Sequence, residues 1–406
     1  MRCRLLNCWC GLPDPMSAPQ FKPVVAPQLD SKLPGVGTTI FTVMSALASE
    51  HGALNLSQGF PDFDGPAQLL DRVTHYLHAG RNQYAPMAGV PSLRSSIAGK
   101  VAALYGRQVN ADTEITVTSG ATEAIFDAVA CVIRAGDEAI VLDPCYDSYE
   151  PAIALAGGRT VHVPMTADFR VDWQRVSDAM SARTRLIILN SPHNPSGATL
   201  AADDLDALEA LIARWPVFLI SDEVYEHIIF DGRTHSSLLL RDALWSRAFV
   251  VSSFGKTYHT TGWKIGYCVA PAPLTAEFRK IHQFVTFCTN TPVQLALADF
   301  LQDCPEHHLE LPGFYQKKRD YFLSLLGGSR FKFTPSTGTY FQMLDYSAIS
   351  NERDVDLARR WTVENKLASI PISVFYATAP ESTLLRFCFA KDDATLARAA
   401  EILCSL

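Results

Sequence analysis

Short, uninterrupted runs of apolar residues recur through the middle of the chain, and each run ends in polar residues. Four such runs cover residues 139–142, 186–189, 218–220 and 249–251, and they end at Asp143, Asn190, Asp222 and Ser252. Continuous apolar runs of this length are typical of strands buried on both faces of a parallel sheet. Because ligands bind beyond the carboxyl ends of such strands, the polar residues at these ends indicate where a site would form.

Helical patterns separate the strands. Residues 122–134 place Ile125, Phe126, Val129 and Ile133 on one face, and residues 202–215 show the same periodicity. Further strands are predicted at 114–118 and 264–270, with helices at 39–49, 67–79 and 94–105 and a helical region over 274–301. This alternation predicts an α/β domain.

The pattern breaks around residues 303–311, and a smaller α+β unit follows. Its strands are predicted near 340–345 and 383–389, and its helices near 354–365 and 394–403. A chain of 406 residues exceeds what one simple core organises. We therefore expect a disordered extension over 1–32, an arm over 33–53 that packs with the small domain, a large domain over 54–302 and a small domain over 303–406.

Charge and cysteine content limit which binding partners and metal sites we expect. The chain has 35 Lys and Arg residues against 42 Asp and Glu residues, a net charge of −7, so we expect no nucleic-acid partner. Ten cysteines include no C-x-x-C pair, and Cys131, Cys268 and Cys388 lie in apolar runs, which favours reduced thiols over a structural metal site.

The N-terminus lacks the apolar core of a signal peptide, and Met16 could equally be a start. No apolar run has membrane-spanning length, so we expect a cytoplasmic protein without a membrane partner.

A lysine in the polar stretch after the strand at 249–251 is the candidate nucleophile. The stretch is residues 252–264, SSFGKTYHTTGWK, with Lys256 near its centre. Its GKT tripeptide is not a nucleotide-binding loop, since that motif requires glycine at the position of Val250. A desolvated lysine can instead attack a carbonyl and form a Schiff base, as in pyridoxal phosphate enzymes. The ordinary alternative is a surface lysine in a turn.

The other groups that pyridoxal phosphate requires also have candidates. Asp222, at a buried strand end, would be kept ionised by the ring nitrogen of the cofactor, although it could simply cap a turn. Tyr225 and Asn194 could donate to the phenolic oxygen, while an Asn-Pro turn is the plainer interpretation of Asn194. Tyr146 could stack on the ring or belong to the core.

An anion site is predicted at residues 119–122, where a strand meets a helix N-terminus and free N–H groups are available. Ser253 and Lys264 could complete a phosphate shell. Helix capping and a solvated lysine are the alternatives.

Together these residues resemble the class I/II aminotransferases of the fold-type I pyridoxal phosphate enzymes. The branch they resemble most contains bacterial methionine aminotransferases and kynurenine/glutamine aminotransferases. The matching stretches are residues 55–63, 82–89, 118–123, 143–151, 190–197, 221–227, 252–266 and 385–391. The resemblance implies an α/β fold with a mostly parallel seven-stranded sheet between helices, plus a smaller α+β domain.

The resemblance also implies a role for each site residue. Lys256 would be the Schiff-base lysine and proton carrier, and Arg386 would clamp the substrate carboxylate with help from Gly59 and Asn194. Tyr84 and Phe287 would reach into the site of a second subunit, which implies a homodimer. The residues implied to bind the cofactor are Gly120, Ala121, Thr122, Tyr146, Asn194, Asp222, Tyr225, Ser253 and Lys264.

The predicted activity is ping-pong transamination from a neutral, bulky amino acid to a 2-oxo acid. The resemblance favours methionine as donor, then aromatic amino acids, histidine or glutamine. Cys288 stands where kynurenine-preferring relatives often carry histidine, which weakens a kynurenine assignment. Two alternatives are a carbon–sulfur β-lyase and a non-catalytic sensor that binds pyridoxal phosphate, the latter disfavoured because the catalytic set is present.

Overall fold

The computed structural model describes residues 26–406. The predicted extension over 1–32 and the possible start at Met16 therefore lie largely or wholly outside the described residues. Among residues 26–406, no helix combines the length and the apolar character needed to cross a membrane.

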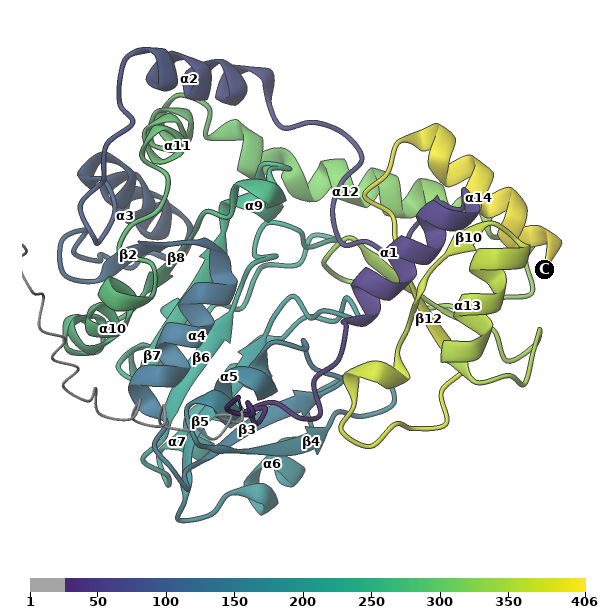
Figure 1. The fold of residues 1–406 in the computed structure, drawn as a ribbon, viewed down its shortest axis with the longest axis horizontal. Coiled ribbons are helices and arrows are strands. Elements are labelled where there is room, and N and C mark those ends of the chain that lie inside the picture. The colour runs from purple at the N-terminus through teal and green to yellow at the C-terminus, as the bar shows by residue number, and fades with distance from the viewer. Residues whose placement is uncertain (1–25) are drawn as a thin grey trace, which may run out of the picture.

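A seven-stranded sheet forms the centre of the larger part of the molecule (Figure 1), in the order β2-β8-β7-β6-β5-β3-β4. Strand β8 runs opposite to the other six strands of this sheet. The strands are β2 (Ile115–Thr118), β3 (Glu138–Asp143), β4 (Arg159–Pro164), β5 (Thr184–Asn190), β6 (Phe218–Asp222), β7 (Ala248–Ser253) and β8 (Gly266–Val269).

Helices cover both faces of this sheet, which explains why its strands read as unbroken apolar runs. In β5, Leu186 and Ile188 pack toward the core under α4, while Ile187 and Leu189 pack into the core on the opposite face. The helices are α2 (Ala67–His78), α3 (Pro91–Tyr105), α4 (Gly120–Val132), α5 (Tyr149–Leu155), α6 (Trp173–Ala179), α7 (Ala202–Ile212), α8 (Asp242–Trp245), α9 (Phe254–Thr257), α10 (Ala272–Val285) and α11 (Thr291–Asp303).

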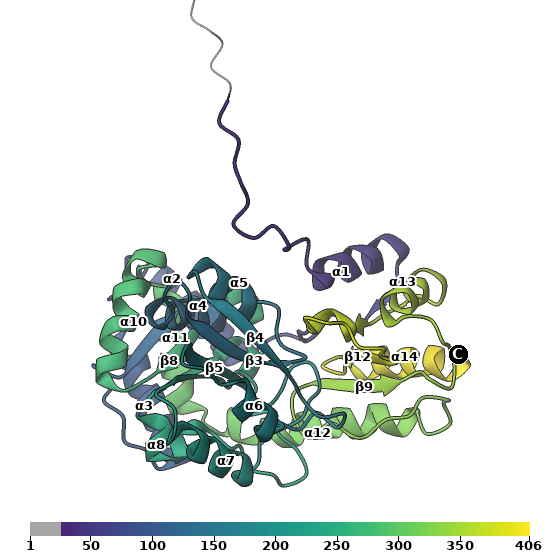
Figure 2. The same cartoon turned by 90° about the horizontal axis from the view of Figure 1, so that it is seen from below.

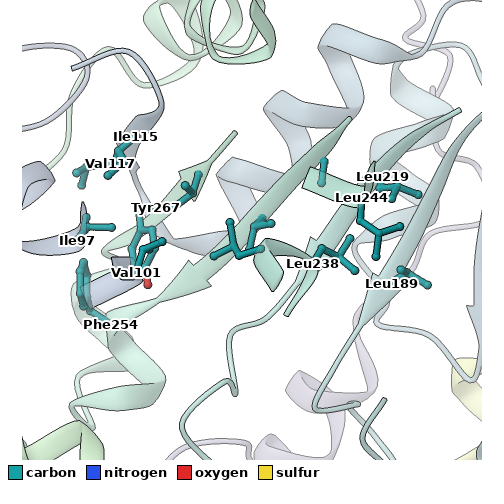
Figure 3. Close-up of a cluster of buried hydrophobic side chains, with 14 of the residues drawn as sticks. Ile97, Val101, Ile115, Val117, Leu189, Leu219, Leu238, Leu244, Phe254 and Tyr267 are labelled. Carbon is teal, nitrogen blue, oxygen red and sulfur yellow. The ribbon is translucent and has the colours of Figure 1, made fainter. Parts of the chain in front are cut away.

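One of these cores anchors the segment that carries Lys256. Figure 3 shows Ile97 and Val101 of α3 packed near Val117 of β2, and Tyr267 of β8 beside them. Phe254 is 3% exposed in the same core, and its ring lies 5.1 Å from that of Tyr267. Burial of such a side chain contributes about 1.5–3 kcal/mol, so α9 is fixed to the sheet two residues before the lysine.

The smaller part has its own sheet, in the order β11-β12-β9, between two layers of helices (Figure 2). The N-terminal helix α1 packs on α13, and β1 pairs with β10. The elements are α1 (Ile40–His51), β1 (Leu54–Asn55), α12 (Glu306–Leu325), β9 (Phe341–Asp345), α13 (Asp354–Glu364), β10 (Leu367–Ala368), β11 (Ile370–Pro371), β12 (Leu384–Cys388) and α14 (Asp393–Ser405).

The predicted elements are largely confirmed, but two predicted boundaries differ, and the short helices α5 and α6 and the strand β4 were not located from the sequence. The helical region over 274–301 is two helices, because the chain turns at Phe287, which has φ 71°, and restarts at the Asn290 cap. The predicted break at 303–311 covers only Cys304 and Pro305, because α12 begins at Glu306 and includes Pro312. The edge strand β4 was not located from the pattern, since five of its six residues are exposed or half-buried.

Candidate active site

A cavity of about 190 Å³ lies at the carboxyl ends of the central strands. It brings together most of the residues singled out from the sequence, and adds Ile125, Asn190, Val224 and Thr261. The predicted residues that line it are Gly120, Ala121, Thr122, Tyr146, Asn194, Asp222, Tyr225, Ser253, Lys256 and Lys264.

Lys256 presents its amine at this cavity. Its Nζ atom donates to the Gly59 carbonyl at 3.0 Å and lies 5.6 Å from the ring centres of Tyr225 and Tyr340. Desolvation lowers the pKa of the Lys256 amine to about 8. An amine with this pKa is partly unprotonated near neutral pH, as a nucleophile and base requires.

Asp222 ends β6 and is 4% exposed. Its carboxylate accepts a 2.7 Å hydrogen bond from the Tyr149 hydroxyl. Burial raises the pKa of Asp222 to about 6, although the bond from Tyr149 opposes the shift. A buried carboxylate of this kind is stabilised as an anion by a cationic partner in the cavity. Nothing in the sequence indicated this contact between Tyr149 and Asp222.

The first turn of α4 forms the anion-binding end of the cavity. Gly120 has φ 76°, and a Cβ atom placed there would lie 3.2 Å from Lys264 Nζ. Glycine thus allows both the backbone turn and the close approach of the lysine. The free N–H groups of this turn and the Lys264 ammonium suit a phosphate group. Ser253 caps α9, with its hydroxyl accepting from Gly255 N at 3.2 Å.

Arg386 on β12 is fully buried and lies beside the cavity, behind Asn194. Its Nη1 atom donates to Asn194 Oδ1 at 2.7 Å and its Nη2 atom to the Ser57 carbonyl at 2.9 Å. Its Nε atom has no partner in the described part of the chain, and burial lowers the pKa of the guanidinium to about 10. A buried guanidinium without a carboxylate partner is a site for an anion.

Aromatic rings enclose Arg386. The centre of the Phe341 ring lies 3.9 Å from the guanidinium carbon, and those of Phe41 and Phe375 lie at 5.2 and 5.9 Å. Phe41 belongs to α1, so the N-terminal helix forms part of the cover.

Three other predicted residues lie away from the cavity lining. The Gly59 carbonyl is occupied by Lys256 and by the Tyr340 hydroxyl at 2.5 Å, and a Cβ atom at Gly59 would lie 2.9 Å from the Phe341 ring. Tyr84 and Phe287 lie on the surface, 85% and 43% exposed, with their rings 5.6 Å apart. One chain therefore does not bring these two aromatic residues to its own cavity.

The donor set fits the cofactor that the sequence suggests. The cavity offers an amine for an aldehyde, a buried carboxylate for a ring nitrogen, Asn194 and Tyr225 for a phenolic oxygen, and the α4 turn for a phosphate. Two clusters with metal-ligating residue types lie elsewhere, Asp143/Cys145/His162 and Glu123/Asp127/His282. In both, the histidine and a carboxylate are 2.7–2.8 Å apart, which is a hydrogen-bond distance.

Comparison with known proteins agrees with this geometry. Residues 52–403 match the family model of the class I and II aminotransferases. The chain is 55% identical to the methionine aminotransferase of Escherichia coli over 372 residues, which cover 91% of this chain and 96% of that protein. It is 30% identical to human kynurenine–oxoglutarate transaminase 1 over 408 residues, covering 92% and 97% of the two chains.

Solved structures show the same relationship. A crystal structure from Escherichia coli, described together with a methionine aminotransferase function, superposes with a TM-score of 0.92 at 55% identity, covering 94% of this chain and 100% of that one. N-succinyldiaminopimelate aminotransferase from Mycobacterium tuberculosis superposes with a TM-score of 0.90 at 37% identity, covering 93% and 100%.

Proposed function

The chain belongs to the class I and II aminotransferases, and we propose that it uses pyridoxal phosphate to move the α-amino group of a neutral, bulky amino acid to a 2-oxo acid. Methionine is the proposed first donor, supported by the 55% identity to the methionine aminotransferase of Escherichia coli. Aromatic amino acids, histidine and glutamine are the next candidates.

The observation that carries the proposal is the shared attachment of two cationic side chains to one loop. Arg386 donates to the Ser57 carbonyl and Lys256 to the Gly59 carbonyl, so the loop over residues 57–59 fixes both. A carboxylate bound by Arg386 would place the adjacent α-carbon toward the amine of Lys256. This is the arrangement that proton transfer at an amino-acid α-carbon requires.

Each residue of the cavity has a proposed task. When bound, pyridoxal phosphate supplies an electron-withdrawing ring and a carbon that accepts the amino group. Lys256 would take the proton from the α-carbon of the amino donor and, in the reverse half-reaction, give a proton to the α-carbon of the oxo-acid acceptor, and Asp222 would accept the hydrogen bond of the ring nitrogen. Asn194 and Tyr225 donate hydrogen bonds to the phenolic oxygen, and Tyr146 packs on the ring face. Gly120, Ala121, Thr122, Ser253 and Lys264 hold the phosphate.

Arg386 is proposed to bind the substrate carboxylate through two N–H groups. Because Arg386 is fully buried and its guanidinium lies among Phe41, Phe375 and Phe341, binding of a carboxylate requires a neighbouring side chain to move. Phe41 is the best candidate, since α1 is attached mainly to the small domain.

We further propose a homodimer with shared sites and a cytoplasmic location. Exposed apolar side chains at Tyr84, Phe284, Val285 and Phe287 support the dimer, because monomeric proteins seldom expose such groups together. The described cysteines are all free thiols, which supports a reducing compartment.

Addition of methionine to the purified protein tests the function. The absorbance band of the bound cofactor should shift, and the 2-oxo acid of methionine should form in one equivalent per site without an acceptor and continuously only when a 2-oxo acid acceptor is present. Lys256→Ala should lose both responses and keep the fold. Release of a thiol and pyruvate from cystathionine without an acceptor would indicate a β-lyase, and an unchanged spectrum with every neutral amino acid would contradict the proposal.

A further inference from the structure

His282 on α10 is a buried histidine outside the cavity that contacts two segments of the site. Its Nδ1 atom lies 2.7 Å from Glu123 Oε1, and its Nε2 atom lies 2.9 Å from the Met87 carbonyl oxygen. Glu123 is in the first part of α4, and its other carboxylate oxygen accepts a hydrogen bond from the Ser119 backbone N–H. His282 itself is 0% exposed.

The partners of His282 define its protonation. A backbone carbonyl only accepts hydrogen bonds, so Nε2 must carry a proton, and an ionised Glu123 likewise requires a proton on Nδ1. Burial opposes this charge, but the hydrogen-bonded carboxylate of Glu123 and the nearby carboxylate of Asp127 outweigh it and raise the pKa of His282 to about 9. The side chain is therefore an imidazolium that uses both of its N–H groups.

Asp127 completes the cluster from the next turn of α4. Its Oδ2 atom lies 3.6 Å from His282 Nδ1, and neither of its oxygens has a hydrogen-bond partner in the described residues. Burial raises the pKa of Asp127 to about 6.

A metal ion is a poorer explanation of this cluster. Two ligands on one tetrahedral zinc ion, each about 2.0–2.2 Å from the metal, lie roughly 3.3 Å apart. The 2.7 Å between His282 and Glu123 is shorter and matches a charge-assisted hydrogen bond.

Met87 lies in the loop between α2 and α3, residues 79–90, which also carries Tyr84 and is called the Tyr84 loop. Gln294 accepts from Val90 N at 2.9 Å, and Thr291 donates to the Gln83 carbonyl at 2.6 Å. Both residues lie on α11, so His282 is the attachment of this loop to α10.

We propose that His282 is a positioning residue which holds the Ser119–Thr122 turn of α4 in the shape that binds the cofactor phosphate, and ties that turn to the Tyr84 loop. This inference depends on the proposed function, in that a phosphate-bearing cofactor occupies the cavity. His282 touches neither cofactor nor substrate, and acts through the Glu123 carboxylate on the Ser119 N–H.

Two substitutions of His282 distinguish the contribution of its Nδ1 atom from that of its Nε2 atom. The amide nitrogen of His282→Asn can replace Nδ1 and keep the bond to Glu123, whereas that of His282→Gln can replace Nε2 and keep the bond to Met87. His78→Gln, at an exposed histidine of α2, is the matched control. Each full-length variant is stripped of cofactor and titrated with pyridoxal phosphate and with pyridoxal, which lacks the phosphate.

His282→Gln should bind pyridoxal phosphate about tenfold or more weakly, the effect of one lost charge-assisted hydrogen bond, with pyridoxal affinity unchanged. His282→Asn and His78→Gln should bind both compounds like the wild type. Equal loss for both compounds, equal loss in the Asn and Gln variants, or no loss at all would overturn the role of His282.

A substitution of the other partner, Glu123, shows whether the effect of His282→Gln comes from the lost contact or from misfolding. Glu123→Gln can still accept from the Ser119 N–H but offers His282 no charge, so it should also weaken pyridoxal phosphate selectively, at an unchanged far-ultraviolet circular dichroism spectrum. Unchanged affinity in this variant would contradict the proposal. A wild-type protein that binds pyridoxal phosphate no better than pyridoxal would instead refute the cofactor site itself, and this inference with it.

Discussion

The Tyr149 hydroxyl donates a 2.7 Å hydrogen bond to Asp222, the buried carboxylate at the end of β6. The bond stabilises the charged form of Asp222 and lowers its pKa, against the larger effect of burial. Tyr149 therefore helps to keep ionised the group that is proposed to hold the ring nitrogen.

Tyr149→Phe should shift the acidic limb of the kcat/KM profile upward by about one to two pH units, since a hydrogen bond to a charged group contributes about 1.5–3 kcal/mol. Steady-state rates between pH 5 and 9 measure this, with both substrates varied. Tyr76→Phe removes a comparable 2.6 Å bond to Asp299 far from the cavity and should leave the profile unchanged. A superimposable Tyr149→Phe profile would exclude this role.

Asp222→Asn should stabilise the cofactor-free protein while it abolishes transamination. The pKa of Asp222 is raised from 3.8 to about 6, so the unfolded chain releases this proton first and the folded state loses stability as the pH rises from about 4 to about 6. Above that window the substitution should add about 2–3 kcal/mol to the free energy of unfolding. Urea denaturation at pH 4 and pH 7.5 measures the difference, which should vanish at the lower pH.

Arg386→Lys should lower kcat/KM for methionine by about 100-fold, because a lysine cannot present two parallel N–H groups to a carboxylate. The comparison is Arg360→Lys, which changes a half-buried arginine of α13 paired with Glu352 and Glu364. Initial rates at a saturating concentration of acceptor are the measurement. Near-normal activity of Arg386→Lys would mean that the substrate carboxylate is not bound by Arg386.

Gly120→Ala should weaken pyridoxal phosphate binding as well as stability. The new methyl group would lie about 3.1–3.2 Å from the end of the Lys264 side chain, at a φ of 76°. Gly136→Ala is the matched control, because Gly136 has φ 86° with open space around its Cβ position. Both variants should lose about 1–2 kcal/mol of folding free energy, but only Gly120→Ala should raise the dissociation constant of the cofactor.

Shared sites in a dimer can be tested by co-expression of Lys256→Ala with Tyr84→Ala. Each variant alone should be nearly inactive, whereas a mixed dimer contains one site with neither substitution. Random pairing should then restore about a quarter of the wild-type activity. No recovery, with mixed dimers shown by mass spectrometry, would mean that Tyr84 serves its own subunit.

Strand positions and strand ends could be predicted from the sequence because burial on both faces leaves an unbroken apolar run, as in β5. Asp222 and Lys256 lie two and five residues after the ends of two such runs, so their convergence required only the rule that parallel strands end at one edge. Arg386 was predicted as a site residue from the family resemblance, because its strand β12 belongs to the other sheet and the strand-end rule does not apply to it.

Contacts between distant elements could not be predicted in the same way. The bond between Tyr149 and Asp222 depends on how α5 lies over the sheet, and His282 meets Glu123 across 159 positions of sequence. Neither pairing leaves a periodic pattern. The edge strand β4 was missed because it is not buried on both faces. Its exposed and half-buried positions include Arg159, Thr160 and His162, so it has no continuous apolar run.

The loop over residues 57–59 constrains how donor preference could evolve or be engineered. Its carbonyl groups hold Arg386 and Lys256 at the same time, so a backbone shift there would alter carboxylate affinity and amine basicity together. Libraries aimed at new donors should therefore leave these three positions constant. Phe41, whose ring centre lies 5.2 Å from the guanidinium carbon of Arg386, offers a position outside this loop where substrate fit can change.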